Sequence, residues 1–398
     1  MRGSEQKLRS ALRALVVPDE RDAEERAWRL LSAARTEQPL LEVRRSRARR
    51  RGLQAAVALG LIALIVSPAG ASVRHWVADR VNPGVERAKP ALSALPGSGA
   101  LLVQSQEGPW IVHPDGSKRL LGDFWEASWS PHGLFVVATR SHELAAVEPD
   151  GAARWTITRP GLPRLARWNG PDGYRIAYLE GRSLRGCPCP LRVVNGNSED
   201  DRLLAHNVPL MAPAWKSGPA HLIAFLATPD GVVKVMNSDT RAVVFQTRPG
   251  AGPVSLQWTS GLLFVARADT LQLYSPGGRL VWEWTAPQGS LISSAAARDS
   301  RRIAVVLHIG HTSKVLLLGR DRSPRPLFTG PGSFATPEWS PDGDWLLLPW
   351  PRADQWLFIN PASATPRLHA VANVASQFSS GSPQPGRFPT VAGWCCTP

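Results

Sequence analysis

The stretch PEWSPDGDWLLLPW, residues 337 to 350, places a Ser-Pro-Asp-Gly turn between a tryptophan and a run of apolar residues. The stretch ASWSPHGLFVVATR, residues 127 to 140, repeats this arrangement about 210 residues earlier. Proline presets φ, aspartate accepts hydrogen bonds from nearby backbone N–H groups, and glycine tolerates positive φ. The shared phrase is therefore typical of a turn that leads into a β-strand, and its recurrence suggests a repeated structural unit.

Further copies of the phrase lie between these two. A tryptophan followed by a turn and an apolar run recurs at Trp129, Trp168, Trp215, Trp258 and Trp339. Residues 297 to 309 fit the same frame with alanine in place of the tryptophan, and successive copies begin 39 to 47 residues apart. This spacing is the length of one four-stranded blade of a β-propeller. We interpret the tryptophans as structural anchors of the blades.

The two ends of the repeat region complement each other. Residues 99 to 123 read as a blade that lacks its tryptophan-led segment, and residues 388 to 396 supply a β-rich piece with Trp394 and no blade after it. A C-terminal strand that completes the N-terminal blade leaves no open sheet edge at the seam. The sequence therefore predicts an all-β propeller of about seven blades. Six would result if one weak repeat is irregular or if the tail is only an appendage.

Pro-Asp-Gly triplets recur along the repeat region and predict hairpin turns rather than catalytic carboxylates. Their aspartates are Asp115, Asp150, Asp172, Asp230 and Asp342.

The phrase WSPDGDWLLL, at residues 339 to 348, resembles the repeat of TolB-like and WD-repeat-like propellers, and residues 99 to 396 carry the resemblance. WSPHGLFVVA and WNGPDGYRIAYL match it less closely, and the other copies are degenerate. Two features depart from these families: the Trp-Asp dipeptide of WD repeats is absent, and the N-terminal α/β domain of TolB is missing. The resemblance therefore implies the fold and little about a partner. The layout as a whole resembles uncharacterised membrane-anchored propeller proteins of high-GC Gram-positive bacteria.

An uncharged apolar run at residues 53 to 73 predicts one transmembrane helix, because its 21 residues match the thickness of a bilayer core. An arginine block just before it is expected to stay in the cytoplasm and to set the topology. The block consists of Arg44, Arg45, Arg47, Arg49, Arg50 and Arg51. A cleaved signal peptide is the rival reading, with a small-residue cleavage pattern at residues 69 to 71. About 50 residues precede the apolar run, and this favours a retained anchor.

These signals divide the chain into four parts. Residues 1–52 form a cytoplasmic helical segment that ends in the arginine block, and residues 53–73 form the transmembrane helix. Residues 74–98 are a stalk linker, and residues 99–398 are an extracytoplasmic propeller closed by the C-terminal strand. Residues 4 to 36 show helical spacing of apolar residues and read as two short amphipathic helices that lie on the membrane or bind a partner. A poorly ordered tail is the alternative that the sequence leaves open.

The four cysteines form two close pairs, Cys187 with Cys189 and Cys395 with Cys396. Neither pair has the spacing of a zinc knuckle or of a thioredoxin-type motif, so we expect no metal site. Disulfides are possible outside the cytoplasm, and the sequence leaves open whether either pair is joined.

No catalytic motif stands out, because the chain has no GxSxG, no HExxH and no EF-hand loop. We therefore expect no enzymatic activity, no catalytic residues and no cofactor. The chain is basic, with 46 Lys+Arg against 32 Asp+Glu. No nucleic-acid motif accompanies the arginine block, so we expect no nucleic-acid partner.

The first functional hypothesis is a non-enzymatic scaffold or binding module, anchored in the cell membrane by a single span. Its propeller would bind a protein, peptide or glycan outside the cytoplasm. The alternative is a transmembrane signalling protein of anti-sigma-like layout, in which the propeller is the sensor.

Overall fold

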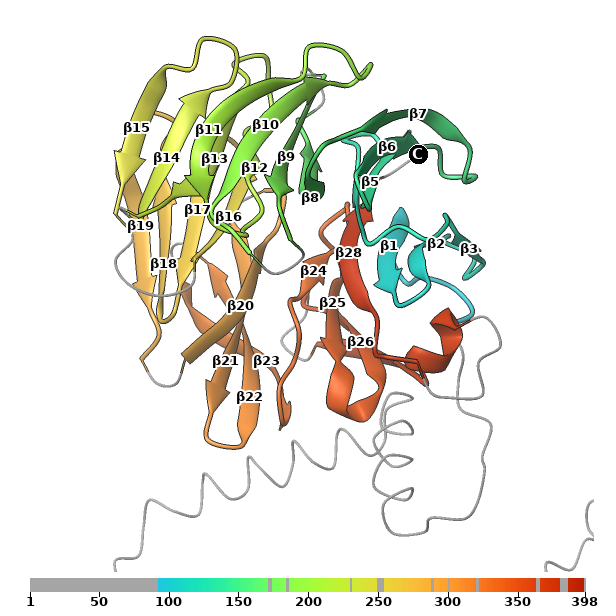
Figure 1. Ribbon diagram of the computed structural model, residues 1–398. Coiled ribbons are helices and arrows are strands. Elements are labelled where there is room, and N and C mark those ends of the chain that lie inside the picture. The colour runs from blue at the N-terminus through green and yellow to red at the C-terminus, as the bar shows by residue number, and fades with distance from the viewer. Residues whose placement is uncertain are drawn as a thin grey trace, which may run out of the picture. The chain divides into compact units, whose positions relative to one another are not determined.

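The computed structural model describes residues 92 to 396, except residues 171–173, 184–185, 230, 249–253, 288–289, 300, 320–321, 363–365 and 380–385. The described strands form seven four-stranded antiparallel sheets, which are the blades of a β-propeller (Figure 1). The sequence-based prediction of seven blades is confirmed.

The blades are numbered along the chain, and each begins with its innermost strand. Blade 1 consists of β28 (Thr390–Cys395), β1 (Ala100–Ser105), β2 (Gly108–Val112) and β3 (Lys118–Leu120). Blade 2 consists of β4 (Glu126–Trp129), β5 (Val136–Arg140), β6 (Glu143–Val147) and β7 (Ala153–Thr158). Blade 3 consists of β8 (Leu162–Trp168), β9 (Arg175–Gly181), β10 (Cys189–Asn195) and β11 (Arg202–Val208). Blade 4 consists of β12 (Ala214–Trp215), β13 (Leu222–Ala227), β14 (Val232–Asn237) and β15 (Val243–Thr247).

The remaining blades follow the same order. Blade 5 consists of β16 (Val254–Thr259), β17 (Leu262–Arg267), β18 (Thr270–Tyr274) and β19 (Leu280–Thr285). Blade 6 consists of β20 (Ser290–Ala296), β21 (Arg302–Ile309), β22 (Thr312–Gly319) and β23 (Arg322–Pro331). Blade 7 consists of β24 (Glu338–Trp339), β25 (Leu346–Trp350), β26 (Gln355–Asn360) and β27 (Arg367–Ala372). Two 3-10 helices, η1 (Pro351–Ala353) and η2 (Ala375–Phe378), flank β26 and β27.

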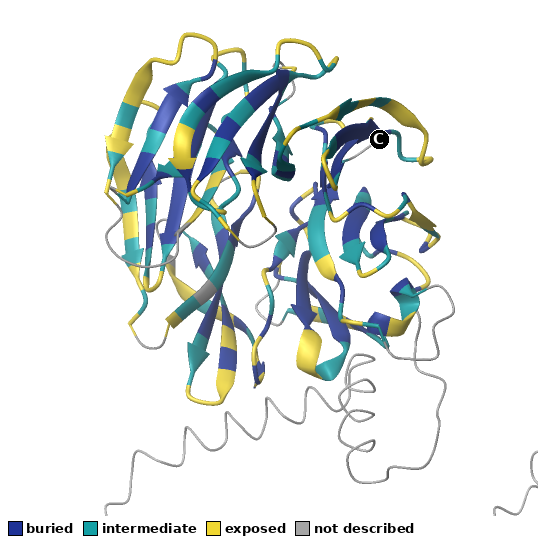
Figure 2. Ribbon diagram, viewed as in Figure 1, coloured by how far each residue is buried: buried dark blue, intermediate teal, exposed yellow. Residues whose placement is uncertain are grey.

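The second and third strands of each blade are apolar runs because they pack between two neighbouring blades. All five residues of β25 are buried, and so are the first four residues of β5. The fourth strand instead faces solvent on one side, and its residues alternate between exposed and half-buried in β7. Figure 2 shows this change from buried inner strands to exposed outer strands.

The C-terminal strand closes the ring. β28 pairs with β1 in antiparallel register, so that Trp394 lies opposite Leu101, and Figure 1 shows the red strand beside the cyan one. One apolar cluster lies at each of the seven junctions between blades. The cluster between blades 7 and 1 contains Phe358, Val103 and Trp394 and is as buried as the other six. The seam is therefore a packed junction, as the complementary ends of the repeat region predicted.

The predicted transmembrane helix and arginine block, residues 44 to 73, lie outside the described residues. Within the part of the chain that the structure describes, no helix is long and apolar enough to cross a membrane.

Candidate functional site

Each repeat tryptophan lies at or next to the C-terminal end of an innermost strand. Four innermost strands end at the tryptophan: β4 at Trp129, β8 at Trp168, β12 at Trp215 and β24 at Trp339. In β16 and β28 the tryptophan, Trp258 and Trp394 respectively, is the penultimate residue. The chain turns directly after these residues, so the turns that follow the tryptophans lie on one face of the propeller, here called the turn face.

Several of these indoles join one blade to another segment. Trp215 Nε1 donates to Arg167 O of blade 3 at 2.9 Å, and Trp339 Nε1 donates to Ala295 O of blade 6 at 3.1 Å. Trp394 Nε1 donates to Ser98 O at 2.8 Å. Among the described residues, the buried indole nitrogens of Trp129 and Trp258 have no hydrogen-bond partner. Trp215, Trp339 and Trp394 thus tie neighbouring segments of the ring together.

The turn aspartates that the structure describes bind the backbone and side chains of their own turns. The Asp115 carboxylate accepts hydrogen bonds from the hydroxyl and N–H of Ser117, and these hydrogen bonds lower its pKa. Asp150 accepts the N–H of Ala152 in the same way. Asp172 and Asp230 lie outside the described residues.

Asp342 holds more than its own turn. Its carboxylate accepts hydrogen bonds from Ser340 Oγ at 2.5 Å and from Ser98 Oγ at 2.6 Å, and also from the Asp344 N–H. Burial alone would raise the pKa of this carboxyl, but the hydrogen bonds outweigh burial and lower it to about 2. Asp342 therefore ties the segment before β1 to the turn of blade 7.

Both cysteine pairs are joined as disulfides in the structure. Cys187 precedes β10 and Cys189 begins it, so this pair lies at the connection between β9 and β10. Cys395 and Cys396 lie against the turn after β4: Cys395 Sγ is 3.7 Å from Ser130 O, and Cys396 Sγ is 3.3 Å from Pro131 O. The C-terminal pair therefore supports a turn whose side chains line a pocket.

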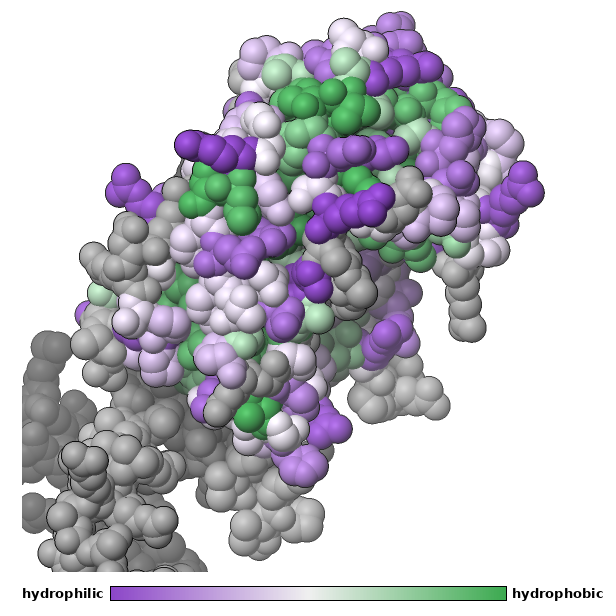
Figure 3. Space-filling view, turned by 90° about the vertical axis from the view of Figure 1, so that its left-hand side faces the viewer, coloured by the Kyte–Doolittle hydropathy of each residue, from purple (hydrophilic) through white to green (hydrophobic). Residues whose placement is uncertain are grey.

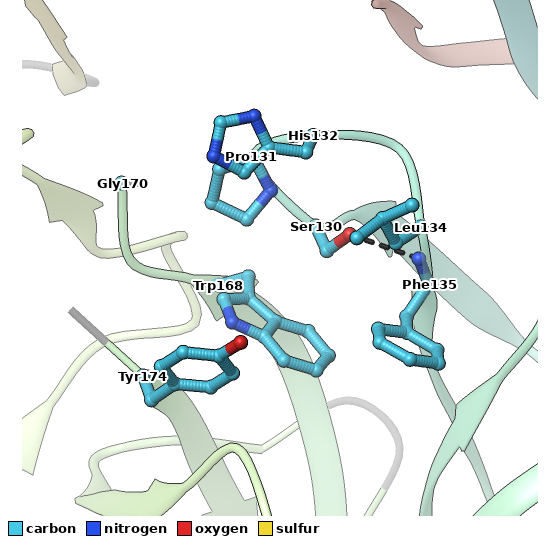
Figure 4. Close-up of a pocket in the computed structure, with 8 residues that line it drawn as sticks. All are labelled: Ser130, Pro131, His132, Leu134, Phe135, Trp168, Gly170 and Tyr174. Carbon is cyan, nitrogen blue, oxygen red and sulfur yellow. Dashed lines mark hydrogen bonds between the residues drawn. The ribbon is translucent and has the colours of Figure 1, made fainter. Parts of the chain in front are cut away.

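That pocket opens on the turn face at the junction of blades 2 and 3 (Figure 4). It encloses about 360 Å³, including the space at its open mouth. Its walls come from the turn after β4 and from the end of β8 and the residues that follow it. The lining residues are Ser130, Pro131, His132, Leu134, Phe135, Trp168, Gly170 and Tyr174.

Aromatic rings form the floor and one wall of this pocket. The rings of Phe135 and Trp168 stack nearly parallel, at 13° between planes and 6.1 Å between centroids. Leu134 and Tyr174 are the most exposed large apolar side chains among the described residues, at 64% and 68% exposed. Ser130 Oγ accepts the N–H of Phe135 at 2.9 Å, the dashed line in Figure 4, and so fixes the turn.

Several polar groups at the pocket have no partner in the described part of the chain. No described residue accepts a hydrogen bond from the Trp168 indole N–H or from the Tyr174 hydroxyl, and no carboxylate lines the pocket among the described residues. A charged cluster begins at Arg175, the residue after Tyr174. Arg175 and His221 both contact the Asp239 carboxylate, and these contacts link blades 3 and 4. Burial raises the pKa of Asp239, but hydrogen bonds from His221 and Arg175 outweigh burial and lower it.

A second pocket lies on the opposite face, between the β9–β10 and β13–β14 connections. It is lined by Cys187, Pro188, Asn207, Pro209, Thr228 and Pro229. Thr228 N and Oγ1 both donate to Asn207 O, which joins blades 3 and 4 at this place.

Apolar side chains are also exposed on two outer strands. Val243 and Val244 begin β15, and Leu280 and Val281 begin β19. Figure 3 faces the side of the propeller that carries these strands and shows hydrophobic side chains gathered toward its upper end, among hydrophilic ones. Irregular register where β15 and β19 pair with their neighbours interrupts both edges, a feature that discourages pairing with another chain.

A half-buried charged network lies between blades 2 and 3. Arg159 contacts Asp201 at 2.6 Å and Glu180 at 3.5 Å, and Arg192 contacts Asp201 at 3.0 Å. The Tyr178 hydroxyl donates to Asp201, and burial together with this hydrogen bond raises the pKa of Tyr178. Each charge has a partner, so the network binds blade to blade. The described residues include no group of His, Cys, Asp or Glu arranged to hold a metal ion.

Sequence patterns did not identify the aromatic pocket. The signal lay in the difference between the two best copies of the repeat phrase, since His132 and Leu134 stand where WSPDGDW has Asp342 and Asp344. That exchange removes two carboxylates from the turn and leaves an apolar wall.

No family model matches this chain, and no curated protein is similar to it in sequence. Solved propellers match its structure. The C-terminal WD40 domain of Sif2 has a TM-score of 0.51 at 14% identity, over 70% of this chain and 85% of that one. Hsv2 of Kluyvelomyces marxianus has a TM-score of 0.50 at 10% identity, over 68% of this chain and 93% of that one. Likeness at such low identity shows the fold alone: the described part of the chain is a seven-bladed propeller of the WD40 type.

Proposed function

We propose that this chain is a non-enzymatic binding module, anchored in a cell membrane by residues 53–73, whose propeller captures a protein or peptide outside the cytoplasm. The observation that carries the binding role is the open aromatic pocket between blades 2 and 3. Centres of protein interfaces are rich in Tyr, Trp and Phe and poor in charge, and the lining of this pocket has that composition.

A protein or peptide suits this pocket better than a glycan. Most of the described lining is apolar or aromatic, so few side chains there can form hydrogen bonds to the many hydroxyls of a sugar. The anchor rests on the uncharged run behind the arginine block, which predicts a cytoplasmic N-terminus and an external propeller.

Proximity labelling in living cells tests the binding role. A labelling enzyme fused after residue 398 is compared in the wild type, in a Leu134→Ala/Tyr174→Ala variant and in a Val243→Ala/Leu280→Ala control. The control removes apolar side chains that are 50% and 46% exposed from the outer strands. We expect the control to label the same neighbours as the wild type and the pocket variant to lose one of them. Identical neighbours in all three would contradict the proposal.

The location is tested separately. Protease added to intact cells should digest the propeller and spare residues 1–40. Complete protection of the propeller would contradict an external location.

A signalling role is the second candidate, and the helical spacing in residues 4 to 36 is the observation that favours it. Such a protein would bind its ligand outside and a regulator inside. A pull-down with residues 1–52 that recovers a sigma factor would place signalling ahead of simple binding.

A further inference from the structure

The aromatic pocket has a repeat-related counterpart at the junction of blades 7 and 1. The turn after β24 and the tryptophan of the following innermost strand supply five residues at equivalent positions of the repeat. Ser340, Pro341, Asp342, Trp345 and Trp394 correspond to Ser130, Pro131, His132, Phe135 and Trp168.

The chain itself fills this counterpart with residues 97 to 99. A Cβ added to Gly97 would lie 3.1 Å from Ser340 Cβ, 3.1 Å from Trp394 Cζ2 and 3.2 Å from Trp345 Cδ1, so only glycine fits without displacement of its neighbours. Trp394 Nε1 donates to Ser98 O at 2.8 Å. A bent stretch with the sequence Pro-Gly-Ser-Gly, residues 96 to 99, in which Gly99 has a positive φ of 83°, therefore sits on the turn and the indole.

Ser98 also binds the turn with its donors. Its N–H and its Oγ donate to Asp342 Oδ2 at 3.2 and 2.6 Å. Ser98 thus offers its backbone carbonyl as an acceptor to the Trp394 indole, and it offers its N–H and its hydroxyl as donors to the Asp342 carboxylate.

The pocket between blades 2 and 3 has the same turn as the site between blades 7 and 1, with the Phe135 ring and the Trp168 indole at the equivalent positions. Unlike that site, this pocket is open. Ser130 N–H donates to Phe135 O and Gly133 N–H to Ser130 O, the same two hydrogen bonds that Ser340 and Gly343 make in blade 7. The Trp168 indole N–H has no acceptor among the described residues. Phe135 stands in place of the larger Trp345, which leaves more room beside the indole.

One exchange changes what this pocket can recognise. His132 stands where Asp342 binds Ser98, so a ligand at this place meets an imidazole rather than a carboxylate. An imidazole with a proton on either nitrogen donates a hydrogen bond, and a protonated one also carries positive charge. The matching ligand side chain is a carboxylate.

We propose that the pocket between blades 2 and 3 binds a Gly-Asp-containing segment of a partner protein, in the manner in which residues 97 to 99 bind between blades 7 and 1. The Trp168 indole N–H donates to a backbone carbonyl of the segment, and His132 donates to its carboxylate. Leu134 and Tyr174 cover the flanking residues. This inference rests on the proposed binding function and names the ligand class of the same site.

Peptide titration of the full chain in detergent micelles tests this, with fluorescence anisotropy as the readout. The probe is the blocked peptide SALPGDGA, which is residues 93 to 100 with aspartate in place of Ser98; SALPGSGA is its matched control. We expect saturable binding of SALPGDGA and about tenfold weaker binding of SALPGSGA, because a hydrogen bond to a charged group is lost.

Substitutions locate the binding. Trp168→Phe keeps the stacked ring and removes the N–H, and we expect it to weaken SALPGDGA binding about tenfold; Trp125→Phe is the control on the opposite face. His132→Asp should reverse the preference so that SALPGSGA binds better, as Asp342 binds Ser98. Far-UV circular dichroism verifies that each variant is folded.

Three results would overturn the inference: no saturable binding of SALPGDGA to the folded wild type, binding that is insensitive to Trp168→Phe, or an unchanged preference in His132→Asp. Competition by maltohexaose at the same residues would also overturn it and assign the pocket to a glycan. If the peptide fails while labelling of a neighbour still depends on Leu134 and Tyr174, the ligand class is wrong and the proposed function stands. If both fail, the proposed function fails as well.

Discussion

Closure of the ring predicts that Trp394→Ala is among the most destabilising single substitutions in the propeller. The Trp394 side chain is 4% exposed and meets the Phe358 ring edge-on at 5.7 Å. Truncation of a buried tryptophan costs about 3–5 kcal/mol. Within that total, the ring pair contributes about 0.5–1.5 kcal/mol. The hydrogen bond to Ser98 O contributes about 1 kcal/mol.

Urea unfolding of the full chain, followed by far-UV circular dichroism, measures this loss. Trp394→Phe keeps the ring contact and loses the N–H, so its cost should be smaller, about 1–2 kcal/mol. Trp125→Ala is the matched control, since that indole is 38% exposed, and it should cost under about 1 kcal/mol. If Trp394→Ala cost no more than Trp125→Ala, β28 would not be the strand that holds the seam.

Gly97→Val should lower the free energy of unfolding by about 1–3 kcal/mol in urea, because the valine side chain would clash with Ser340 in the turn of blade 7 and with the indoles of Trp345 and Trp394. An unchanged free energy of unfolding would show that residues 97 to 99 do not pack against this turn. Burial raises the pKa of Glu338 to about 7, so ionisation of this carboxyl destabilises the fold as the pH rises from about 4.5 to 7. Glu338→Gln should therefore stabilise the chain more at pH 8 than at pH 5, as measured by thermal melts. An equal effect of the substitution at both pH values would contradict this. Deletion of residues 1–40 should leave SALPGDGA affinity and neighbour labelling unchanged if the chain only binds, whereas a loss of a transcriptional response with binding intact would favour signalling.

The repeat and its closure were predictable because they depend on local chemistry. The turn phrase, the apolar runs and the complementary ends at residues 99–123 and 388–396 all carry a period that can be read along the chain. The innermost strands were harder to see. Two of them, β12 and β24, have only two residues each and follow Pro213 and Pro337, so they are too short to show alternation. The sequence frame accordingly began each repeat at the tryptophan, whereas in the structure each blade begins with the strand that ends at or near it.

The candidate site could not be predicted because it depends on contacts between distant segments. Trp168 stacks on Phe135 across a blade junction, and the counterpart that explains the pocket places Ser98 on Asp342, 244 residues away in the sequence. The first pair needs the packing of consecutive blades, and the second needs closure of the ring.

Residues 97 to 99 fill one site of the ring, and in our proposal the repeat-related site between blades 2 and 3 receives a partner. The most direct measurement is the position of the indole N–H resonances in a two-dimensional NMR spectrum of the full chain, with the Trp168 signal assigned through Trp168→Phe. On addition of SALPGDGA we expect the Trp168 resonance to move downfield as it donates to the peptide and the Trp394 resonance to stay in place. A Trp168 resonance that stays fixed while the peptide binds elsewhere would contradict the account.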